Sequence, residues 1–244
     1  MGKGVWILAL AAALCMGCKR QKPAATGQTA ANTASVISGR VLFKGTPPPP
    51  KTLPLDPMCG KAYSVPPTES DFNVGPSNGL AEVLVYLKGL PADADQAPPS
   101  ETPLLDQKGC VYSPRVFGVM VNQKFRIRNS DALLHNVHAL PKSNKEFNFA
   151  QVVQGQVNEK SFSVPEVLLR IKCDVHPWMN AHVGVFEHRF FAVTDSNGQF
   201  RLPAGVPAGK FTLEAAHPKG GIVTQEVTIA PGVHKQIELT ISPK

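Results

Sequence analysis

Short runs of hydrophobic residues alternate with polar residues along most of this chain. Val36–Phe43, Ala81–Leu87, Lys124–Asn129 and Phe211–Ala215 have this pattern. In Lys124–Asn129 every second residue is basic and the residues between are hydrophobic, which is typical of a strand with one buried face. The 23 prolines and 20 glycines supply frequent breaks between such runs. Since no stretch has a sustained helical period, we predict an all-β fold.

Turn-forming residues suggest how some of these runs are connected. The tripeptide Ser-Asn-Gly at 196–198 is a turn signal between Phe191–Thr194 and Gln199–Leu202, and we expect these two runs to pair as a hairpin. Two proline-rich breaks divide the chain. Thr46–Pro50 follows the first predicted strand, and Leu90–Pro103 precedes the segment that carries the candidate chemistry.

The first residues resemble a bacterial lipoprotein signal. Lys3 precedes the hydrophobic run Val5–Gly17, which is shorter than the roughly 20 residues that a membrane-spanning helix needs. The resemblance implies that residues 1–17 are removed and that Cys18 becomes acylated, although Cys15 stands where such signals usually have leucine. The alternative is an ordinary secretory signal that is cut nearby.

Residues 18–35 are polar, rich in alanine and threonine, and without periodicity, so we predict a flexible tether. Lys19 follows Cys18, which by the same resemblance favours the outer membrane. We therefore expect an exported protein, periplasmic or at the cell surface, that is held to the membrane by a lipid anchor.

The charge balance narrows the class of partner. The formal net charge is +7, without a block of lysine and arginine or a stripe of basic and aromatic residues. We therefore expect no nucleic-acid partner. A moderate positive charge steers encounters with acidic surfaces, such as that of an acidic cytochrome or dehydrogenase.

We expect different roles for the five cysteines of the chain. Cys15 leaves with the signal and Cys18 takes the lipid, which leaves three cysteines in an oxidising compartment. Cys173 lies in a stretch rich in metal ligands, so it has a separate role. Cys59 and Cys110 are then candidates to pair as a disulfide, for which the sequence gives no geometry.

The stretch IKCDVHPWMNAHV carries Cys173, His176 and Met179, each three residues from the next. A thiolate with two imidazoles, and a thioether at a longer distance, is a ligand set that suits copper. Three of these ligands come from one short loop, and His135 supplies the second imidazole from an earlier strand and turn.

These residues resemble the cupredoxin family, and in particular its amicyanin-like and pseudoazurin-like members. The resemblance covers residues 103–187 and rests on a histidine followed by asparagine and on a Cys-x-x-His-Pro-aromatic-Met loop. It implies a Greek-key β-sandwich with one type 1 copper. His135, Cys173 and His176 would be equatorial ligands, and Met179 would be the axial ligand.

The same resemblance implies an exit for electrons. In the family the loop histidine reaches the surface within an apolar patch, so we expect electrons to leave at His176, beside Pro177 and Trp178. The loop also departs from the family pattern. Val175 replaces a proline, which restores an N–H that can bond the thiolate and raise the reduction potential.

Asp174 replaces a small or hydroxyl residue of the family. This change puts in doubt a loop-bracing contact with the Asn136 side chain.

The segments on either side, residues 36–92 and 190–243, resemble the two halves of a carboxypeptidase regulatory-like domain. The first half contains Ile-Ser-Gly-Arg-Val and Ala-Glu-Val-Leu-Val-Tyr-Leu-Lys-Gly, and the second contains Thr-Asp-Ser-Asn-Gly-Gln-Phe and Val-Pro-Ala-Gly-Lys-Phe-Thr-Leu. We infer a smaller Ig-like β-sandwich with the cupredoxin domain inserted between its strands, which exposed loops tolerate. The alternative is two sandwiches in tandem.

The remaining histidines are expected to have no part in the metal site. On a strand, His138 faces away from His135, so a structural or surface role is expected for it. His182 lies close in sequence to the loop but is not a ligand in the family. We expect His188, His217 and His234 to lie at the surface.

The leading functional hypothesis is an electron carrier rather than an enzyme. The sequence has no second cysteine in the ligand loop, no haem-attachment motif and no evident catalytic triad or carboxylate pair. The alternatives are a copper-binding or copper-delivery protein of the cell envelope, and a structural module with a vestigial metal site.

Overall fold

The structure is a computed structural model that describes residues 1–2, 34–91 and 97–243. Residues 33–244 belong to one compact unit. The regular secondary structure of its described part is almost entirely β-strand, which confirms the predicted all-β fold. The predicted acylation at Cys18 and nearly all of the predicted signal and tether fall outside the described residues. Within the described ranges, no helix is long and apolar enough to cross a membrane.

The middle of the chain forms two sheets, with strand orders β10-β9-β12-β13-β7 and β11-β8-β5-β6. Buried side chains from both sheets share one hydrophobic core. In β8 the alternation predicted from the sequence is present, because Phe125 and Ile127 are buried while Arg126 is exposed. The strands are β5 (Leu104–Gln107), β6 (Tyr112–Ser113), β7 (Val116–Met120), β8 (Phe125–Asn129), β9 (His135–Leu140), β10 (Phe147–Gln151), β11 (Val157–Lys160), β12 (Glu166–Lys172) and β13 (Asn180–Phe186).

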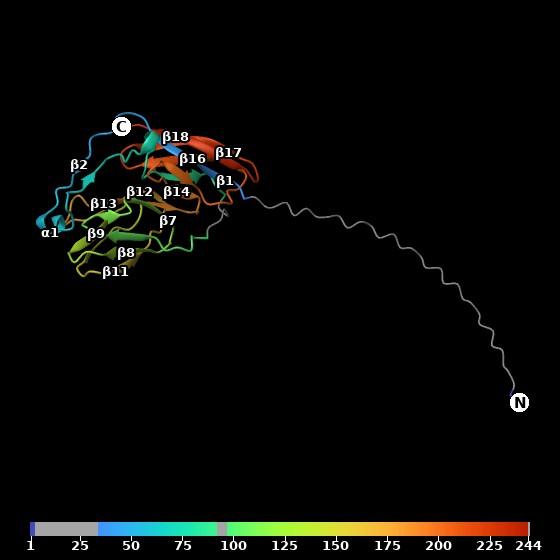
Figure 1. Ribbon diagram of the computed structural model, residues 1–244, viewed down its shortest axis with the longest axis horizontal. Helices are drawn as coiled ribbons and strands as arrows, with labels where there is room; N and C mark the ends of the chain where they lie inside the picture. The colour runs from blue at the N-terminus through green and yellow to red at the C-terminus, as the bar shows by residue number, and fades with distance from the viewer. Residues whose placement is uncertain (3–33, 92–96, 244) are drawn as a thin grey trace. The chain divides into compact units, whose positions relative to one another are not determined.

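The two flanks of the chain also form two sheets, with orders β15-β1-β18 and β14-β4-β16-β17. Their inward side chains make a second hydrophobic core. Figure 1 shows β1, β16, β17 and β18 grouped together, and β8, β9 and β11 in another group. The strands are β1 (Val36–Phe43), β4 (Leu84–Lys88), β14 (Phe191–Val193), β15 (Gln199–Arg201), β16 (Gly209–His217), β17 (Gly221–Ile229) and β18 (His234–Ile241).

Residues far apart in the sequence are paired in these flank sheets. β1 runs parallel to β18, from the pair of Val36 with His234 to the pair of Phe43 with Ile241. β4 lies antiparallel to both β14 and β16. Each flank sheet therefore contains strands from before and after the middle sheets.

A third hydrophobic cluster joins the flank sheets to the middle sheets. Leu84 and Tyr86 of β4 and Ala216 of β16 pack with Val116 of β7 and Phe186 of β13. The rings of Tyr86 and Phe186 are 4.8 Å apart. Contact through large apolar side chains makes both pairs of sheets parts of one packed unit.

The connection between β1 and β4, residues 44–83, is called the β1–β4 connection below. It contains β2 (Lys51–Thr52), the single-turn helix α1 (Pro57–Gly60), β3 (Thr68–Glu69) and the 3₁₀ turn η1 (Pro76–Asn78). Asp56 caps α1, because its side chain accepts hydrogen bonds from the N–H groups of Met58 and Cys59. In Figure 1, α1 lies on the side of the labels for β9 and β13, away from those for β17 and β1.

Two predictions for the flanks are wrong in detail. The turn at 196–198 forms, but β14 pairs with β4 while β15 pairs with β1, so these strands belong to different sheets and do not form a hairpin. Ser35, predicted to end the tether, is buried, and its hydroxyl donates to the carbonyl oxygen of Ala230 at 3.1 Å. The folded unit therefore includes this residue.

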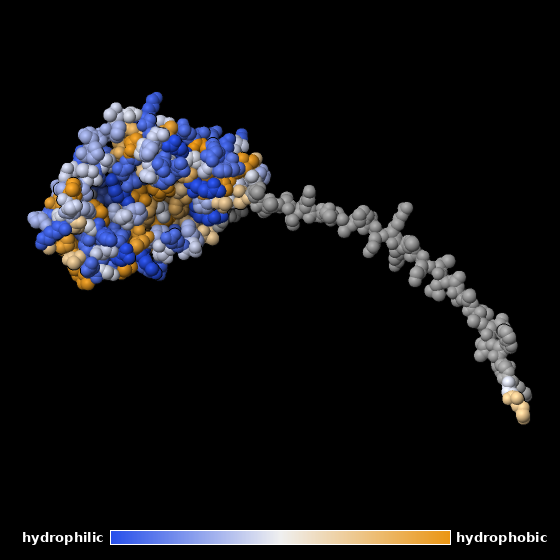
Figure 2. Space-filling view, viewed as in Figure 1, coloured by the Kyte–Doolittle hydropathy of each residue, from blue (hydrophilic) through white to orange (hydrophobic). Residues whose placement is uncertain are grey.

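The face of the molecule seen in Figure 2 is mainly hydrophilic, with hydrophobic residues in several small groups. This distribution agrees with the strand pattern, because most large hydrophobic side chains of the flank and middle strands are buried.

Ile37→Ala should lower the free energy of unfolding by about 2–5 kcal/mol, because Ile37 is fully buried in the flank core and the truncation leaves a cavity. Ile222→Ala in β17 is the matched control, since Ile222 is 47% exposed, and its effect should stay within about 0.5 kcal/mol. Urea unfolding followed by fluorescence measures both. Equal losses in the two variants would contradict the assigned flank core.

Candidate metal centre

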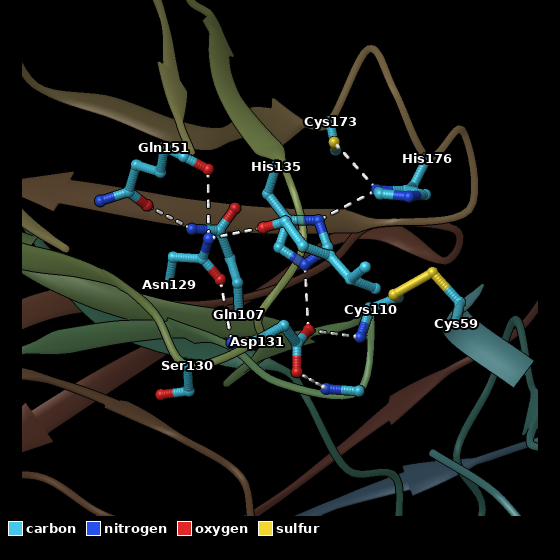
Figure 3. Close-up of polar contacts among 12 residues, drawn as sticks. Cys59, Gln107, Cys110, Asn129, Ser130, Asp131, His135, Gln151, Cys173 and His176 are labelled. Carbon is cyan, nitrogen blue, oxygen red and sulfur yellow. Dashed lines mark hydrogen bonds and ion pairs between the residues drawn. A yellow bond between two sulfur atoms is a disulfide. The ribbon is translucent and has the colours of Figure 1, made fainter. Parts of the chain in front are cut away.

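His135, Cys173 and His176 meet in the interior of the middle sheets. His135 is the first residue of β9, and the other two lie in the loop between β12 and β13. One ligand atom from each residue lies within 4.8 Å of the others. The two histidine Nδ1 atoms are 3.0 Å apart, and the Cys173 sulfur is 3.7 Å from Nδ1 of His176. Figure 3 shows the two imidazoles turned towards each other, with Cys173 beside His176.

The spacing and chemistry of these donors fit a copper ion. Metal–nitrogen bonds of about 2 Å and metal–sulfur bonds of about 2.3 Å place donors on one metal about 3–4 Å apart, which is the separation found here. All three residues are buried, His135 at 0%, Cys173 at 1% and His176 at 4% exposure. A thiolate and two imidazoles form a donor set that favours copper.

The loop between β12 and β13 is closed by its own backbone. The N–H of Met179 donates to the carbonyl oxygen of His176 at 2.9 Å, and the N–H of Cys173 donates to that of Met179 at 3.1 Å. Met179 is buried in the same hydrophobic cluster as Cys173. These bonds close the loop that carries Cys173, His176 and Met179 into a compact turn.

The environment of Cys173 favours the thiolate form. Burial by itself raises the pKa of this thiol, but a hydrogen bond with His135 and the backbone N–H groups of Asn136, His176 and Val175 outweigh it and lower the pKa below its ordinary value. The N–H of Asn136 lies 3.5 Å from the sulfur. The Val175 N–H, which a proline would lack, is thus one of the groups that lower the pKa of this thiol.

Asn136 braces the loop despite the presence of Asp174. The backbone N–H of Asp174 donates to the Asn136 side-chain oxygen, and the Asn136 amide donates back to the Asp174 carboxylate at 3.1 Å. The doubt raised by Asp174 is thus resolved in favour of the contact. The carboxylate also accepts from Asn148 at 2.8 Å and pairs with Lys172, so the aspartate extends the brace.

Asp131 holds the far side of His135, and sequence reasoning missed it. Its Oδ2 is 2.9 Å from His135 Nε2, as Figure 3 also shows. The side-chain oxygen of Asn129 accepts from the backbone N–H of Asp131 at 3.0 Å, and its amide donates to the carbonyl oxygen of Leu133 at 2.8 Å, so Asn129 shapes the turn. The signal in the sequence was a carboxylate four residues before a candidate ligand histidine.

The two histidines titrate in opposite directions. Burial lowers the pKa of His135, but Cys173 and Asp131 outweigh it and raise this pKa above its usual value. Burial and the nearby positive charge of His135 lower the pKa of His176. Because both Nε2 atoms face carboxylates, both Nδ1 atoms are turned inwards, where a metal can bind them.

His176 does not reach the surface, so this expectation is wrong. It is covered by the β1–β4 connection, where Asp56 places Oδ2 3.3 Å from His176 Nε2. Cys59 in α1 forms a disulfide with Cys110, and both sulfurs lie within 4.8 Å of a ring nitrogen of His176. The sequence comparison with cupredoxins missed this cover because it arises from residues outside 103–187.

Pro177 and Trp178, which were expected beside the electron exit, differ in their exposure to solvent. Pro177 is exposed, while Trp178 is half-buried. The Trp178 indole N–H donates to the carbonyl oxygen of Cys110 at 2.9 Å, and its ring lies 5.2 Å from that of His176. Trp178 therefore links the ligand loop to the disulfide.

The other histidines do not join this cluster. His138 lies 2.9 Å from Asp174 and 2.8 Å from Glu146, a structural role of the kind expected. Burial and nearby arginines lower the pKa of His182 to about 4.

His217 was predicted at the surface but is buried, and this prediction is wrong. It stacks on Phe72 and accepts hydrogen bonds from the N–H groups of Lys219 and Gly220 at the β16–β17 turn. His188 is half-buried, with its ring 3.0 Å from the Leu87 carbonyl oxygen, and His234 is exposed.

No protein-family model matches this chain, and no curated protein matches it. Among solved structures, a purple cupredoxin from Nitrosopumilus maritimus is 22% identical, with a TM-score of 0.30, over 34% of this chain and 98% of that one. An amicyanin variant with Cu(I) is 17% identical, with a TM-score of 0.31, over 41% and 97%. A copper-containing nitrite reductase from Thermus scotoductus SA-01 is 17% identical, with a TM-score of 0.33, over 39% and 26%. Each likeness covers less than half of this chain.

Copper affinity should fall as the pH is lowered. Protons compete with the metal for the ligand nitrogens, and the raised pKa of His135 extends this competition to a higher pH. Below that pKa the apparent affinity should decrease by up to about tenfold per pH unit for each proton displaced. Competition with a chromophoric Cu(I) chelator between pH 5 and 8 measures this dependence.

Asp131→Asn tests whether the pKa of His135 sets this pH dependence, because the Asp131 carboxylate contributes to the raised pKa of His135. In this variant the decrease in copper affinity should begin at a lower pH. A pH-independent affinity in the unaltered protein would contradict a competition between protons and copper for these nitrogens.

Proposed function

We propose that this protein carries single electrons by means of one type 1 copper bound by His135, Cys173, His176 and Met179. The observation that carries the proposal is the convergence of a thiol and two imidazoles in a buried pocket, with ligand atoms within 4.8 Å of one another. Copper in such a site supplies a one-electron couple, Cu(I)/Cu(II).

The residues around the ligands favour electron transfer without rearrangement of the ligand set. Both imidazoles have their outer nitrogen next to a carboxylate, and Asn136 braces the loop that holds Cys173. A ligand set that is fixed by such partners changes little when the charge on the metal changes. This rigidity supports a carrier. The four proposed ligands leave little open coordination on the metal for a substrate, so we propose that the protein is not an enzyme.

Burial of the ligands favours retention of copper over delivery. A delivery protein has to pass its metal to an acceptor's ligands, which need access to the site. Here Cys173 is 1% exposed and His176 is 4% exposed. Copper delivery and a scaffold with a vestigial site are therefore the weaker alternatives.

We further propose that the carrier works at the cell envelope. The signal-like residues before Cys18 support a lipid anchor, and the net charge of +7 supports an acidic redox partner such as a cytochrome or dehydrogenase. The pairing of strands from both flanks in the same sheets supports a copper-binding domain inserted into a regulatory-like sandwich.

Residues 34–244 loaded with Cu(II) should show an intense visible thiolate-to-copper band and a narrow hyperfine splitting in electron paramagnetic resonance. Cys173→Ala should abolish both, because it removes the sulfur from the buried ligand set. His234→Ala, at an exposed position, is the control and should leave the spectra unchanged. An ordinary type 2 spectrum, or a band that survives in Cys173→Ala, would overturn the proposal.

Val175→Pro should lower the reduction potential, because proline has no N–H to direct at the Cys173 sulfur. A hydrogen bond of about 1 kcal/mol that favours the reduced state corresponds to about 40 mV for a one-electron couple. Cyclic voltammetry measures the change, and Val175→Ala keeps the N–H as a control. Equal potentials in the proline and alanine variants would count against a role for this N–H.

A further inference from the structure

The outer nitrogen of each candidate ligand histidine faces an aspartate. His135 Nε2 lies 2.9 Å from Oδ2 of Asp131, four residues earlier in the chain. His176 Nε2 lies 3.3 Å from Oδ2 of Asp56, which comes from the β1–β4 connection, outside the segment that resembles cupredoxins. Both rings therefore direct Nδ1 inwards, where the two atoms are 3.0 Å apart.

Each aspartate is itself fixed by a turn that contains one cysteine of the disulfide. Asp56 accepts from the N–H groups of Met58 and Cys59 at 2.8 and 2.9 Å. Asp131 accepts from those of Gly109 and Cys110 at 2.7 and 2.8 Å. The disulfide between Cys59 and Cys110 joins the two turns.

Other contacts hold the β1–β4 connection at the same place. The Tyr63 hydroxyl donates to the carbonyl oxygen of Gly109 at 2.7 Å, and the Trp178 indole donates to that of Cys110 at 2.9 Å. The turn at 109–110 is thus bonded both to the connection and to the ligand loop. Movement of α1 away from His176 would break the Tyr63 bond and is limited by the disulfide.

We propose that Asp56 is a positioning residue of the metal centre, held in place by its turn and the Cys59–Cys110 disulfide. It keeps the proton of the His176 imidazole on Nε2 and the lone pair of Nδ1 turned towards the metal. The inference rests on the proposed copper site for its purpose, but the orientation of His176 can be tested without metal.

A carboxylate behind a ligand histidine has two general effects. It selects the tautomer whose other nitrogen binds the metal, and it restricts rotation of the ring. Loss of such partners typically lowers metal affinity about 10–100-fold. Asp56 has a side chain that is 42% exposed, so solvent has access to it. An effect towards the lower end of that range is therefore expected.

The arrangement also gives the flank sheets a part in the metal centre. β1 and β4 anchor the two ends of the connection that carries Asp56. Of the two aspartates that face the imidazoles, Asp56 thus lies in a segment that starts and ends in the flank sheets.

The test compares Asp56→Ser with the unaltered chain. Serine retains a side-chain oxygen that can cap α1 but lacks the oxygen that faces His176. The matched control is Asp71→Ser, because Asp71 lies in the same connection and pairs with Lys51 and Lys219 on the surface. Equal unfolding midpoints for the two variants establish that any difference is local.

The first readout uses metal-free protein and nitrogen-15 NMR of the histidine rings. In the unaltered chain and in Asp71→Ser, we expect a protected Nε2–H signal from His176. In Asp56→Ser this signal should broaden or disappear through exchange with water, while that of His135 persists. A protected His176 signal in Asp56→Ser would overturn the proposal, whether or not the protein binds copper.

The second readout is the Cu(I) affinity by chelator competition. Asp56→Ser should bind about 10-fold more weakly, at the lower end of the general range, and Asp56→Asn, which keeps a neutral acceptor, should lie between Asp56→Ser and the unaltered chain. Unchanged affinity in both variants would overturn the positioning role. If the unaltered chain binds no copper, the proposed function fails, and the metal-free NMR result still decides whether Asp56 orients His176.

The part of the disulfide is tested by Cys59→Ser combined with Cys110→Ser. This double variant should reproduce the loss of protection at His176, because it frees α1 from the turn at 109–110. Full protection of His176 in a folded double variant would overturn the disulfide's role in the proposal.

Discussion

The contact between Nδ1 of His135 and Nδ1 of His176, 3.0 Å apart in the interior, is the constraint on which this structure depends. Two basic nitrogens at that distance need a proton or a metal between them, and a buried charge requires compensation. The thiol of Cys173 lies beside these nitrogens, and the carboxylates of Asp131 and Asp56 on the outer sides of the rings compensate such a charge. The surrounding turns and the disulfide serve to keep these groups in position.

The β1–β4 connection links the flank sheets to this pair of histidines. Its two ends are fixed in different flank sheets, which share a hydrophobic core. The connection therefore has a defined path past the ligand loop. The cluster that contains Tyr86 and Phe186 holds the same two pairs of sheets together. The position of α1 beside His176 is thus a property of the whole folded unit.

The features that could be predicted from the sequence are local ones. The spacing of Cys173, His176 and Met179 lies within one loop, and the alternation in β8 lies within one strand. The turn at 196–198 was recognised, but a turn signal does not say which sheet each strand joins. Asp56 could not be identified as a neighbour of His176, because that contact depends on the path of a connection 120 residues earlier in the chain.

The parallel pairing of β1 with β18 has a consequence for the order of folding. Val36 pairs with His234, so the β15-β1-β18 sheet cannot be completed until the last strand has been synthesised. The strands of the middle sheets all come from residues 104–186 and can pair earlier, since contacts at shorter sequence separation form faster. The loop that carries the candidate ligands is thus able to fold before the outermost sheet closes. A chain interrupted before β18 would keep its ligand residues while β1 stayed without its parallel neighbour, an exposed edge prone to association with other chains.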